Sequence, residues 1–174
     1  AMIITQPTLK DIPKMREILT PEVERGVILE RPLDTMANMI RSYHLAWEEE
    51  DLLSSQNKLI LENKSIQDLK NHVLLGFCAL HIHSLDLAEI RSLIVSPFAQ
   101  RKGVATQLIL DCIKEAGFLG ISEVLVLTYK RILFEKLGFS EISKENIPNQ
   151  KIWADCILCK HFPLCDEIAL IKKI

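Results

Sequence analysis

The chain has 174 residues, of which 48% are hydrophobic and 25% charged, and its formal net charge is −2. This composition is typical of one folded domain with a full hydrophobic core. The near-neutral charge gives no general attraction to nucleic acid or anionic membrane, and no apolar run approaches the ~20 residues that span a bilayer, so neither partner is expected.

The N-terminal residues Ala1-Met2-Ile3-Ile4 have neither the basic start nor the long apolar segment of a secretory signal. We therefore expect a cytoplasmic protein with reduced thiols. The odd number of cysteines, five, also argues against a simple disulfide framework.

The first part of the chain predicts a short strand and two helices. The strand covers residues 3–6 and is followed by Pro7. The first helix is capped by Thr8 or Asp11, with Asp11 favoured because Pro13 then lies in the first turn, and Pro21 ends it. A second helix follows a cap at Asp34, and its apolar stripe comprises Met36, Met39, Ile40, Tyr43 and Trp47.

The rest of the chain predicts strands that form a hairpin and then alternate with helices, as in a mixed α/β sheet. A turn at residues 84–87 joins the two strands of the hairpin. Gly117 or Gly120 ends the longer helix, and Gly138 ends the shorter one. The predicted elements are strands at 58–62, 73–83, 88–95 and 123–129, helices at 104–116 and 132–137, a strand from 139 to 142, and apolar segments at 152–153 and 168–171.

One stretch, A-E-I-R-S-L-I-V-S-P-F-A-Q-R-K-G-V-A-T at residues 88–106, combines a strand, a basic loop and the start of a helix. First-turn N–H groups have no acceptor inside their helix and bind phosphate well. Gly103 and Ala105 allow close approach to that backbone, and Arg101 and Lys102 add positive charge. The nucleotide-binding patterns G-x-x-x-x-G-K-[ST] and G-x-G-x-x-G are absent. The stretch predicts a phosphate site of another kind, with a basic turn that binds nothing as the alternative.

The loop string Q-R-K-G-V-A at residues 100–105 has the form [QR]-x-x-G-x-[GA], and F-E-K-L-G-F follows at 134–139. In this order of strand, loop, helix and strand, the chain resembles the GNAT acetyltransferase superfamily, whose corresponding loop binds the pyrophosphate of coenzyme A. It is also similar to one branch, the short-form amino-acid N-acetyltransferases assigned to N-acetylglutamate synthesis in arginine biosynthesis. That similarity rests on E-I-R-S-L at 89–93, L-T-Y at 127–129 and W-x-D-C-x-x-C-x-x-F-P-x-C-D-E at 153–167.

The resemblance implies an α/β (α+β) GNAT fold over a single domain, residues 3–174, that includes a cysteine-containing tail at 151–174. Its mixed, mostly antiparallel sheet is flanked by about four helices. The implied enzyme is an acyltransferase that uses acetyl-CoA as cosubstrate to acetylate the α-amine of a small-molecule amino acid, L-glutamate first, by direct attack on the thioester. Superfamily members often form homodimers. Forms that sense arginine do so through an amino-acid-kinase-like domain, for which this chain has no room, so such feedback is not expected.

Two other functions stay open. One is a GNAT enzyme for another amine, such as a different amino acid, a polyamine or a protein N-terminus. The other is a non-catalytic module that binds coenzyme A.

The resemblance also assigns the cosubstrate-binding residues. Backbone N–H groups near Ile94 and Val95 pair with the cosubstrate and polarise its thioester carbonyl. The loop that follows holds the pyrophosphate, and Thr106 offers a further donor. The complete predicted set is Leu93, Ile94, Val95, Gln100, Arg101, Lys102, Gly103, Val104, Ala105 and Thr106.

Charged residues of the strand at 88–95 are candidates for the acceptor side. Glu89 and Arg91 are two apart and therefore share a face, which strict alternation also gives to Leu93 and Val95. The Glu89 carboxylate is a candidate base for the amine proton, and the Arg91 guanidinium a candidate ligand for a substrate carboxylate. The alternative is that the two pair with each other or with solvent.

Three further residues are candidates around the acceptor. Arg31 is a second predicted carboxylate ligand, because the loop before the second helix flanks the acceptor in GNAT folds; a surface arginine is the alternative. His81 and His83 alternate along a strand and either line the acceptor pocket or are satisfied within the strand.

Many GNAT enzymes protonate the departing thiolate with a tyrosine in the short helix. The matching position here is Phe134, which has no hydroxyl. Tyr129 is the nearest hydroxyl and the catalytic candidate, with core packing as its alternative. Solvent can also protonate a thiolate.

The tail holds three cysteines and a histidine with the spacing C-x₂-C-x₅-C. Three thiols and an imidazole can hold structural zinc tetrahedrally, although the spacing is not that of a standard zinc finger. Reduced packing thiols are favoured over zinc, and zinc over a partial disulfide. The four candidate ligands are Cys156, Cys159, His161 and Cys165.

Overall fold

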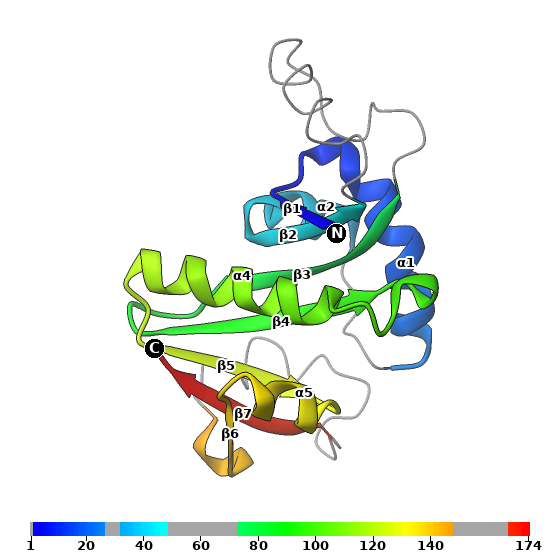
Figure 1. Ribbon diagram of the computed structural model, residues 1–174. Coiled ribbons are helices and arrows are strands. Elements are labelled where there is room, and N and C mark those ends of the chain that lie inside the picture. The colour runs from blue at the N-terminus through cyan, green and yellow to red at the C-terminus, as the bar shows by residue number, and fades with distance from the viewer. Residues whose placement is uncertain (1, 27–31, 49–72, 148–166) are drawn as a thin grey trace.

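A computed structural model describes residues 2–26, 32–48, 73–147 and 167–174 (Figure 1). The α-helices are α1 (Ile12–Glu24), α2 (Leu33–Asn38), α4 (Val104–Leu119) and α5 (Arg131–Lys136). The strands are β1 (Met2–Thr5), β2 (Tyr43–Glu48), β3 (Leu74–Ile82), β4 (Leu87–Val95), β5 (Glu123–Thr128), β6 (Ser140–Ile142) and β7 (Ile168–Lys173). Short 3-10 helices lie at Leu9–Asp11, Ile40–Ser42, Pro97–Ala99 and Lys144–Asn146.

The strands form one seven-stranded sheet in the order β1-β2-β3-β4-β5-β7-β6. Among the described strands, the β4–β5 pair alone is parallel, and the other neighbours are antiparallel. The hairpin of β3 and β4 and the strand–helix alternation that follows are confirmed. The predicted mixed, mostly antiparallel sheet with about four helices is therefore confirmed for the described residues.

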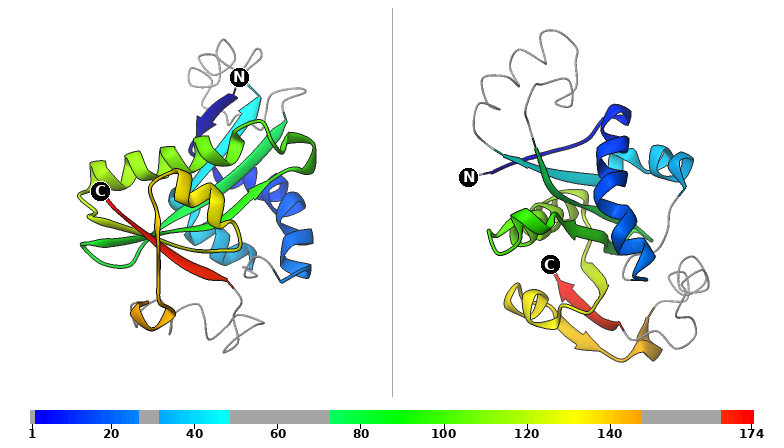
Figure 2. Two further views of the ribbon diagram at one scale, coloured as in Figure 1. Left: turned by 60° about the horizontal axis from the view of Figure 1, so that its bottom comes forward. Right: turned by 90° about the vertical axis from the view of Figure 1, so that its right-hand side faces the viewer.

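Helices cover both faces of the sheet (Figure 2). On one face, which we call the α4 face, α4 and α5 pack on a cluster that includes Cys78, Ile90 and Val126. On the other, the α1 face, α1 and α2 pack on a cluster that includes Tyr43 and Phe77. Burying both faces explains why the central strands are almost continuously apolar.

The prediction of a helix through Tyr43 and Trp47 is wrong. Helix α2 ends at Asn38, and β2 begins at Tyr43 and pairs with β1 and β3. Tyr43, Leu45 and Trp47 are buried in the α1 face, whereas Ala46 is buried in the α4 face. This alternation has a period of two, which only a strand provides.

The prediction that Pro21 ends the first helix is also wrong. Pro21 lies within α1, and the Arg25 N–H donates to its carbonyl at 3.1 Å. At the other end, the Thr8 hydroxyl caps the 3-10 turn, and the Asp11 carboxylate accepts the Thr8 N–H at 2.8 Å. Both predicted caps therefore act together as a capping box.

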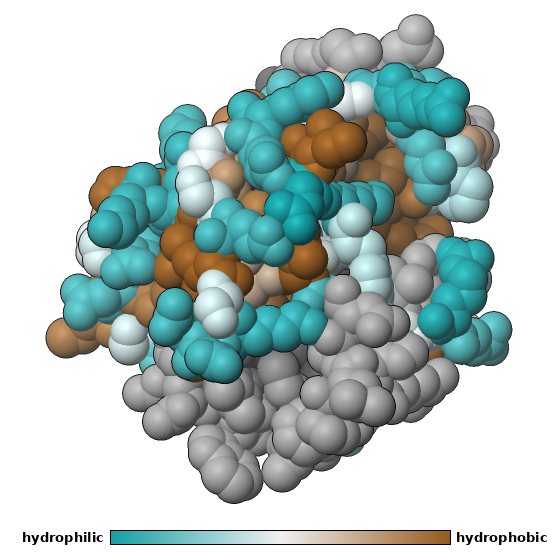
Figure 3. Space-filling view, turned by 90° about the horizontal axis from the view of Figure 1, so that it is seen from below, coloured by the Kyte–Doolittle hydropathy of each residue, from teal (hydrophilic) through white to brown (hydrophobic). Residues whose placement is uncertain are grey.

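No helix in the described part of the chain is long and apolar enough to cross a membrane. On the face seen from below, polar side chains divide the described apolar surface into separate patches (Figure 3).

Candidate active site

The sheet opens between its two parallel strands. Their pairing runs from Leu87↔Glu123 to Ile90↔Val126, and β4 continues beyond it to Val95. The two strands diverge toward the end at which α4 begins (Figure 1). Because an open strand edge presents N–H and C=O groups, the backbone of residues 91–95 can bind an extended ligand where a neighbouring strand would otherwise pair.

A β-bulge lies in the same part of β4. Arg91 pairs with Ala79 and Ile94 with Phe77, so two residues of β4 oppose a single residue of β3. Ser92, the first of the two, has a φ of 53°, in the left-handed region that non-glycine residues seldom adopt. Such a bulge bends the strand and re-aims its backbone groups.

The bulge overturns one sequence prediction. Strict alternation gives Leu93 and Val95 the same face as Glu89 and Arg91, but both pack against the α4-face cluster instead. Ile94 is buried in the α1-face cluster. The extra residue reverses the alternation beyond Ser92, so the acceptor candidates share their face with Ile94.

The predicted anion-binding loop lies directly after β4 and is exposed at residues 100–103. Gly103 is the N-cap of α4 with a φ of 81°, and no side chain caps the helix. The Gln107 N–H makes the first helical hydrogen bond, to the Gly103 carbonyl at 3.1 Å. The N–H groups before Gln107 therefore have no acceptor within the helix, as an anion site requires.

The loop backbone also has the curvature of an anion-binding nest. Arg101 has a φ of 64°, so left-handed residues stand on both sides of Lys102. A Cβ on Gly103 would meet no atom within 4 Å, so its backbone conformation, rather than crowding, requires glycine. The donor set thus fits a phosphate group.

Gly76 sets the distance between β3 and the end of β4. A Cβ at this position would lie 2.5 Å from the Ile94 carbonyl oxygen and 3.3 Å from the Val104 side chain. The absence of a side chain lets the bulged end of β4 and the start of α4 pack closely on β3.

Glu89 and Arg91 form a buried polar cluster with His83. Arg91 Nε donates to Glu89 Oε1 at 3.1 Å, and His83 Nε2 lies 2.7 Å from the same oxygen. The exposed fractions of the Glu89, His83 and Arg91 side chains are 3%, 4% and 6%. The alternative in which Glu89 and Arg91 contact each other is therefore observed, but they do so inside the protein rather than in solvent.

Phe134, at the position of the usual tyrosine, and Tyr129, the predicted proton donor to the thiolate, occupy different environments. Phe134 is fully buried and packs edge-on against Phe139, with ring centroids 5.2 Å apart. Tyr129 follows β5 and is 47% exposed, so it is not the core residue of the alternative interpretation.

Several predicted residues lie outside the described part of the chain. They are Arg31, the strand at 58–62 and the tail residues Cys156, Cys159, His161 and Cys165. Within the described ranges, no group of three or more histidine, cysteine or acidic side chains could hold a metal ion.

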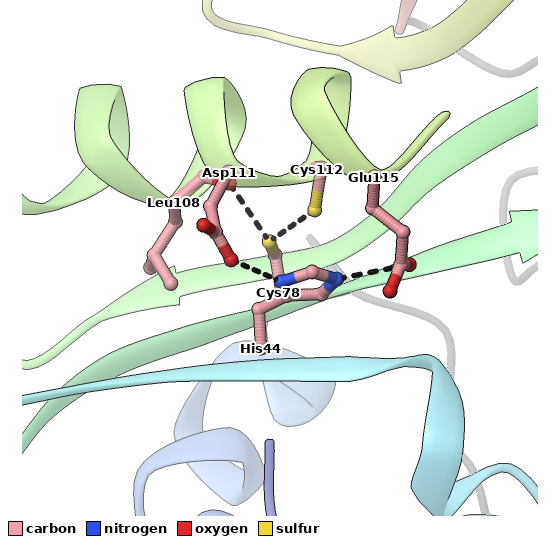
Figure 4. A network of polar contacts seen from close by, with 6 residues as sticks. All are labelled: His44, Cys78, Leu108, Asp111, Cys112 and Glu115. Carbon is pink, nitrogen blue, oxygen red and sulfur yellow. Dashed lines mark hydrogen bonds and ion pairs between the residues drawn. The ribbon is translucent and has the colours of Figure 1, made fainter. Parts of the chain in front are cut away.

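Sequence reasoning missed a second buried polar network, centred on His44 (Figure 4). His44 Nδ1 lies 2.6 Å from an Asp111 oxygen, and Nε2 lies 3.2 Å from a Glu115 oxygen. The two acids are one turn apart on α4, whereas His44 lies on β2. In a strand, residues alternate between the two faces of the sheet, so His44 shares the α4 face with Ala46. The helix predicted for this segment does not give that alternation.

The geometry of this network requires a charged imidazole. A neutral ring has one N–H, whereas both nitrogens of His44 face carboxylates, which only accept. Burial lowers the pKa of His44, but contacts with Cys112, Asp111 and Glu115 outweigh it and raise the pKa to about 10. The Cys112 thiol lies 3.2 Å from Cys78 Sγ, and that contact together with burial holds its pKa well above the usual range. His44 thus fastens α4 to the sheet.

The described residues thus form an α/β sheet that opens between two parallel strands, beside a helix start in a basic loop whose N–H groups fit a phosphate. The acetyltransferase (GNAT) family matches residues 33–139, more than half of the chain. The chain belongs to this family.

Two curated relatives agree. An uncharacterized N-acetyltransferase from Chlorobaculum tepidum is 31% identical over 166 residues, covering 95% of this chain and 92% of that protein. An amino-acid acetyltransferase from Mycobacterium tuberculosis is 24% identical over 140 residues, covering 80% of this chain and 69% of that protein.

Solved structures share the fold. N-acetylglutamate synthase from Neisseria gonorrhoeae, complexed with coenzyme A and N-acetyl-glutamate, matches 99% of this chain with a TM-score of 0.76 and 22% identity. This chain spans only 35% of that protein. Rv2747 from Mycobacterium tuberculosis, in complex with CoA, matches 99% of both chains with a TM-score of 0.73 and 18% identity.

Proposed function

We propose that this GNAT acetyltransferase transfers the acetyl group of acetyl-CoA to the α-amine of an amino acid, and that L-glutamate is its preferred acceptor, as in the first step of arginine biosynthesis. The observation that carries the proposal is the buried Glu89–Arg91 pair on β4, next to the bulge at which the strands separate. Glutamate specificity is further supported by the structural neighbour complexed with coenzyme A and N-acetyl-glutamate.

The cosubstrate is assigned to the β4 edge and the loop after it. Backbone groups of Leu93, Ile94 and Val95 would pair with the pantetheine arm, since β4 extends there past its pairing with β5. The loop residues and first helical turn, Gln100, Arg101, Lys102, Gly103, Val104, Ala105 and Thr106, would hold the pyrophosphate through N–H groups and positive charge.

The acceptor is assigned to the α1 face of β4. We assign the substrate carboxylate to the planar guanidinium of Arg91, whose Nε also contacts Glu89 and so orients the fork. Glu89 would accept the amine proton, directly or through a water molecule. Arg31 is the proposed second carboxylate ligand, which would suit a dicarboxylic amino acid.

The reaction needs an oriented thioester, a neutral amine and a proton for the leaving group. The amine nitrogen forms a bond to the thioester carbonyl carbon, the C–S bond breaks, and the thiolate leaves as coenzyme A. Tyr129 is the proposed proton donor to the thiolate, and water at this exposed position is the other source.

Two alternatives follow from specific observations. The burial of Phe134 at the position of the usual tyrosine favours a module that binds coenzyme A without turnover. A different amine acceptor, including another amino acid, a polyamine or a protein N-terminus, fits the relative named only as an N-acetyltransferase.

The same proposal places the enzyme in the cytoplasm, as one domain over residues 3–174 that acts on a small molecule. A homodimer stays a prediction from the family, and light scattering of the purified chain measures it. Tail zinc also stays a prediction, and metal analysis of the purified protein measures its content.

The deciding experiment measures release of the coenzyme A thiol with a panel of amino acids, polyamines and peptide N-termini. The proposal requires the highest kcat/KM with glutamate. Faster turnover of another amine would favour the first alternative. Binding of coenzyme A by calorimetry without turnover of any amine would favour the second.

Arg91 offers a matched pair of variants. Arg91→Lys keeps the charge but loses the planar fork, and Arg91→Gln loses both, so the KM for glutamate should rise progressively while the KM for acetyl-CoA stays constant. An unchanged KM for glutamate in both variants would contradict the assignment.

A further inference from the structure

His83 lies against the proposed base rather than at a remote part of the sheet. Its Nε2 is 2.7 Å from Glu89 Oε1, and both side chains are almost completely buried. In the β3–β4 register, His81 is the direct partner of Glu89, so His83 reaches Glu89 from the next position on the same face. The Arg91 guanidinium holds the same carboxylate oxygen from β4.

The proposed reaction releases one proton in each turnover. The amino acid enters as an ammonium ion, and the products are a neutral amide and a neutral thiol, so charge balance requires a proton to leave the protein. Glu89 is buried and carries the Arg91 contact, which favours its ionised form. A carboxylate stabilised in this way is a weak base, and a second acceptor next to it would draw the proton onward.

His83 comes directly before the exposed turn of the hairpin. The residue directly follows β3, and its N–H donates to the Leu87 carbonyl at 2.9 Å across the hairpin turn. The turn itself is exposed at residues 84–86. The imidazole thus contacts the buried Glu89, while the backbone of His83 continues directly into the surface turn.

We propose that His83 acts through Glu89, as its positioning residue and as the next acceptor of the amine proton on the way to solvent. This role rests on the acetyltransferase function proposed above. In the accepting state the ring carries its proton on Nδ1 and offers the Nε2 lone pair to the Glu89 carboxyl group. The proton moves from the ammonium nitrogen to Glu89 and then to Nε2. The resulting imidazolium faces the Glu89 carboxylate until it loses one proton to water.

Three charged or titratable groups of the described residues lie around His83. They are Glu89 and Arg91 of β4 and His81 of β3, whose ring centroid lies 4.7 Å away at an interplanar angle of 73°. One negative and one positive side chain therefore adjoin the imidazole, with a second titratable ring in contact.

The test is the pH profile of kcat/KM with the best acceptor amine for the wild type and for His83→Gln. Glutamine can still donate to Glu89 but cannot take up a proton. We expect kcat to fall about tenfold or more with an unchanged KM for acetyl-CoA, within the range that acid–base groups supply. The acid limb of the profile should move to lower pH, because a carboxyl group titrates below an imidazole.

Three controls distinguish a relay from a structural role. Leu85→Gln places the same side chain two residues away, where Leu85 is 91% exposed, and should change nothing. Adding imidazole to His83→Ala should restore part of the rate. The loss in the double variant His83→Gln, Glu89→Gln should not exceed the loss in Glu89→Gln alone, because the two residues act in series.

A His83→Gln enzyme with the wild-type kcat and pH profile would overturn the relay while leaving the acetyltransferase function intact. The relay would also be overturned if kcat fell equally in His83→Gln and His83→Ala, imidazole restored no activity and the acid limb of the pH profile did not shift. That result would instead assign His83 a packing role. A wild type that acetylates no amine would refute the proposed function and the relay with it.

Discussion

The buried imidazolium of His44 predicts a characteristic loss of stability at alkaline pH. Its folded-state pKa, about 10, lies above the ordinary value of 6.5, so folding takes up a proton at intermediate pH. The stabilisation is complete below pH 6.5, declines as the pH rises and is lost above pH 10. His44→Gln should abolish this dependence, because an amide has no proton to lose.

The size of the effect follows from proton linkage. Between the two pKa values the native state holds one more proton than the unfolded state. The free energy of unfolding therefore falls by about 1.4 kcal/mol for each unit by which the pH rises. From pH 7 to pH 9, His44 should therefore contribute a loss of about 3 kcal/mol.

Urea unfolding of the wild type and of His44→Gln at pH 6, 7, 8 and 9 measures this loss. Lysine and tyrosine groups titrate similarly in both proteins, so the difference between the two free energies isolates His44. That difference should be largest at pH 6 and shrink steadily toward pH 9. Asp111→Asn, at a half-exposed partner, should fold well and give a smaller slope. A difference that stays constant from pH 6 to pH 9 would refute a charged His44.

Three other substitutions test the geometry around the site. Gly103→Ala should raise the KM for acetyl-CoA and lower the stability by about 1 kcal/mol, because a φ of 81° strains any residue with a Cβ. An unchanged KM for acetyl-CoA would argue against the loop as the pyrophosphate-binding site. Gly76→Ala should lower both kcat and the urea midpoint, with a loss of about 1–3 kcal/mol in the free energy of unfolding, since its Cβ would meet the Ile94 carbonyl. A wild-type urea midpoint would show that β3 can move away from β4 without loss of stability. Phe134→Leu should destabilise the fold by about 1–3 kcal/mol without changing the pH profile of kcat; an altered profile would assign the ring a part in proton transfer.

The sequence predicted the hairpin, the loop and the helix after it because their signals are local. Gly103, singled out for close approach of an anion, is the N-cap of α4, and its left-handed φ of 81° is an additional reason for glycine at this position. The segment Tyr43–Glu48 was different, since its aromatic residues also fit a helical spacing with the methionines before it. This segment forms a strand because it pairs with β1 and β3, which lie far from it in the sequence. No local sequence pattern indicates that pairing.

The details of the site depended on long-range contacts in the same way. The bulge at Ser92 is one unpaired residue, and a strictly alternating pattern cannot reveal where alternation reverses. The partners of His44 lie 67 and 71 residues away, so the need for a charged imidazole appears only once α4 is packed on β2. Glu89 and Arg91 were found from their charge and their spacing of two along a strand, whereas the contact of His83 with Glu89 required the register of the hairpin.

The position of β7 in the sheet has a consequence for how the protein is made. β7 lies between β5 and β6 and pairs with both, although it is the last strand in the chain. During synthesis, the β1–β4 half can pair as it emerges, but β6 lacks β7, its neighbour among the described strands, until Ile168–Lys173 has been translated. The edge of β5 that β7 later covers is exposed throughout that interval, and an open edge is a template for pairing with other chains. We therefore expect ribosome-bound chains and chains shortened before β7 to aggregate through this half of the sheet, while chains that contain β7 do not.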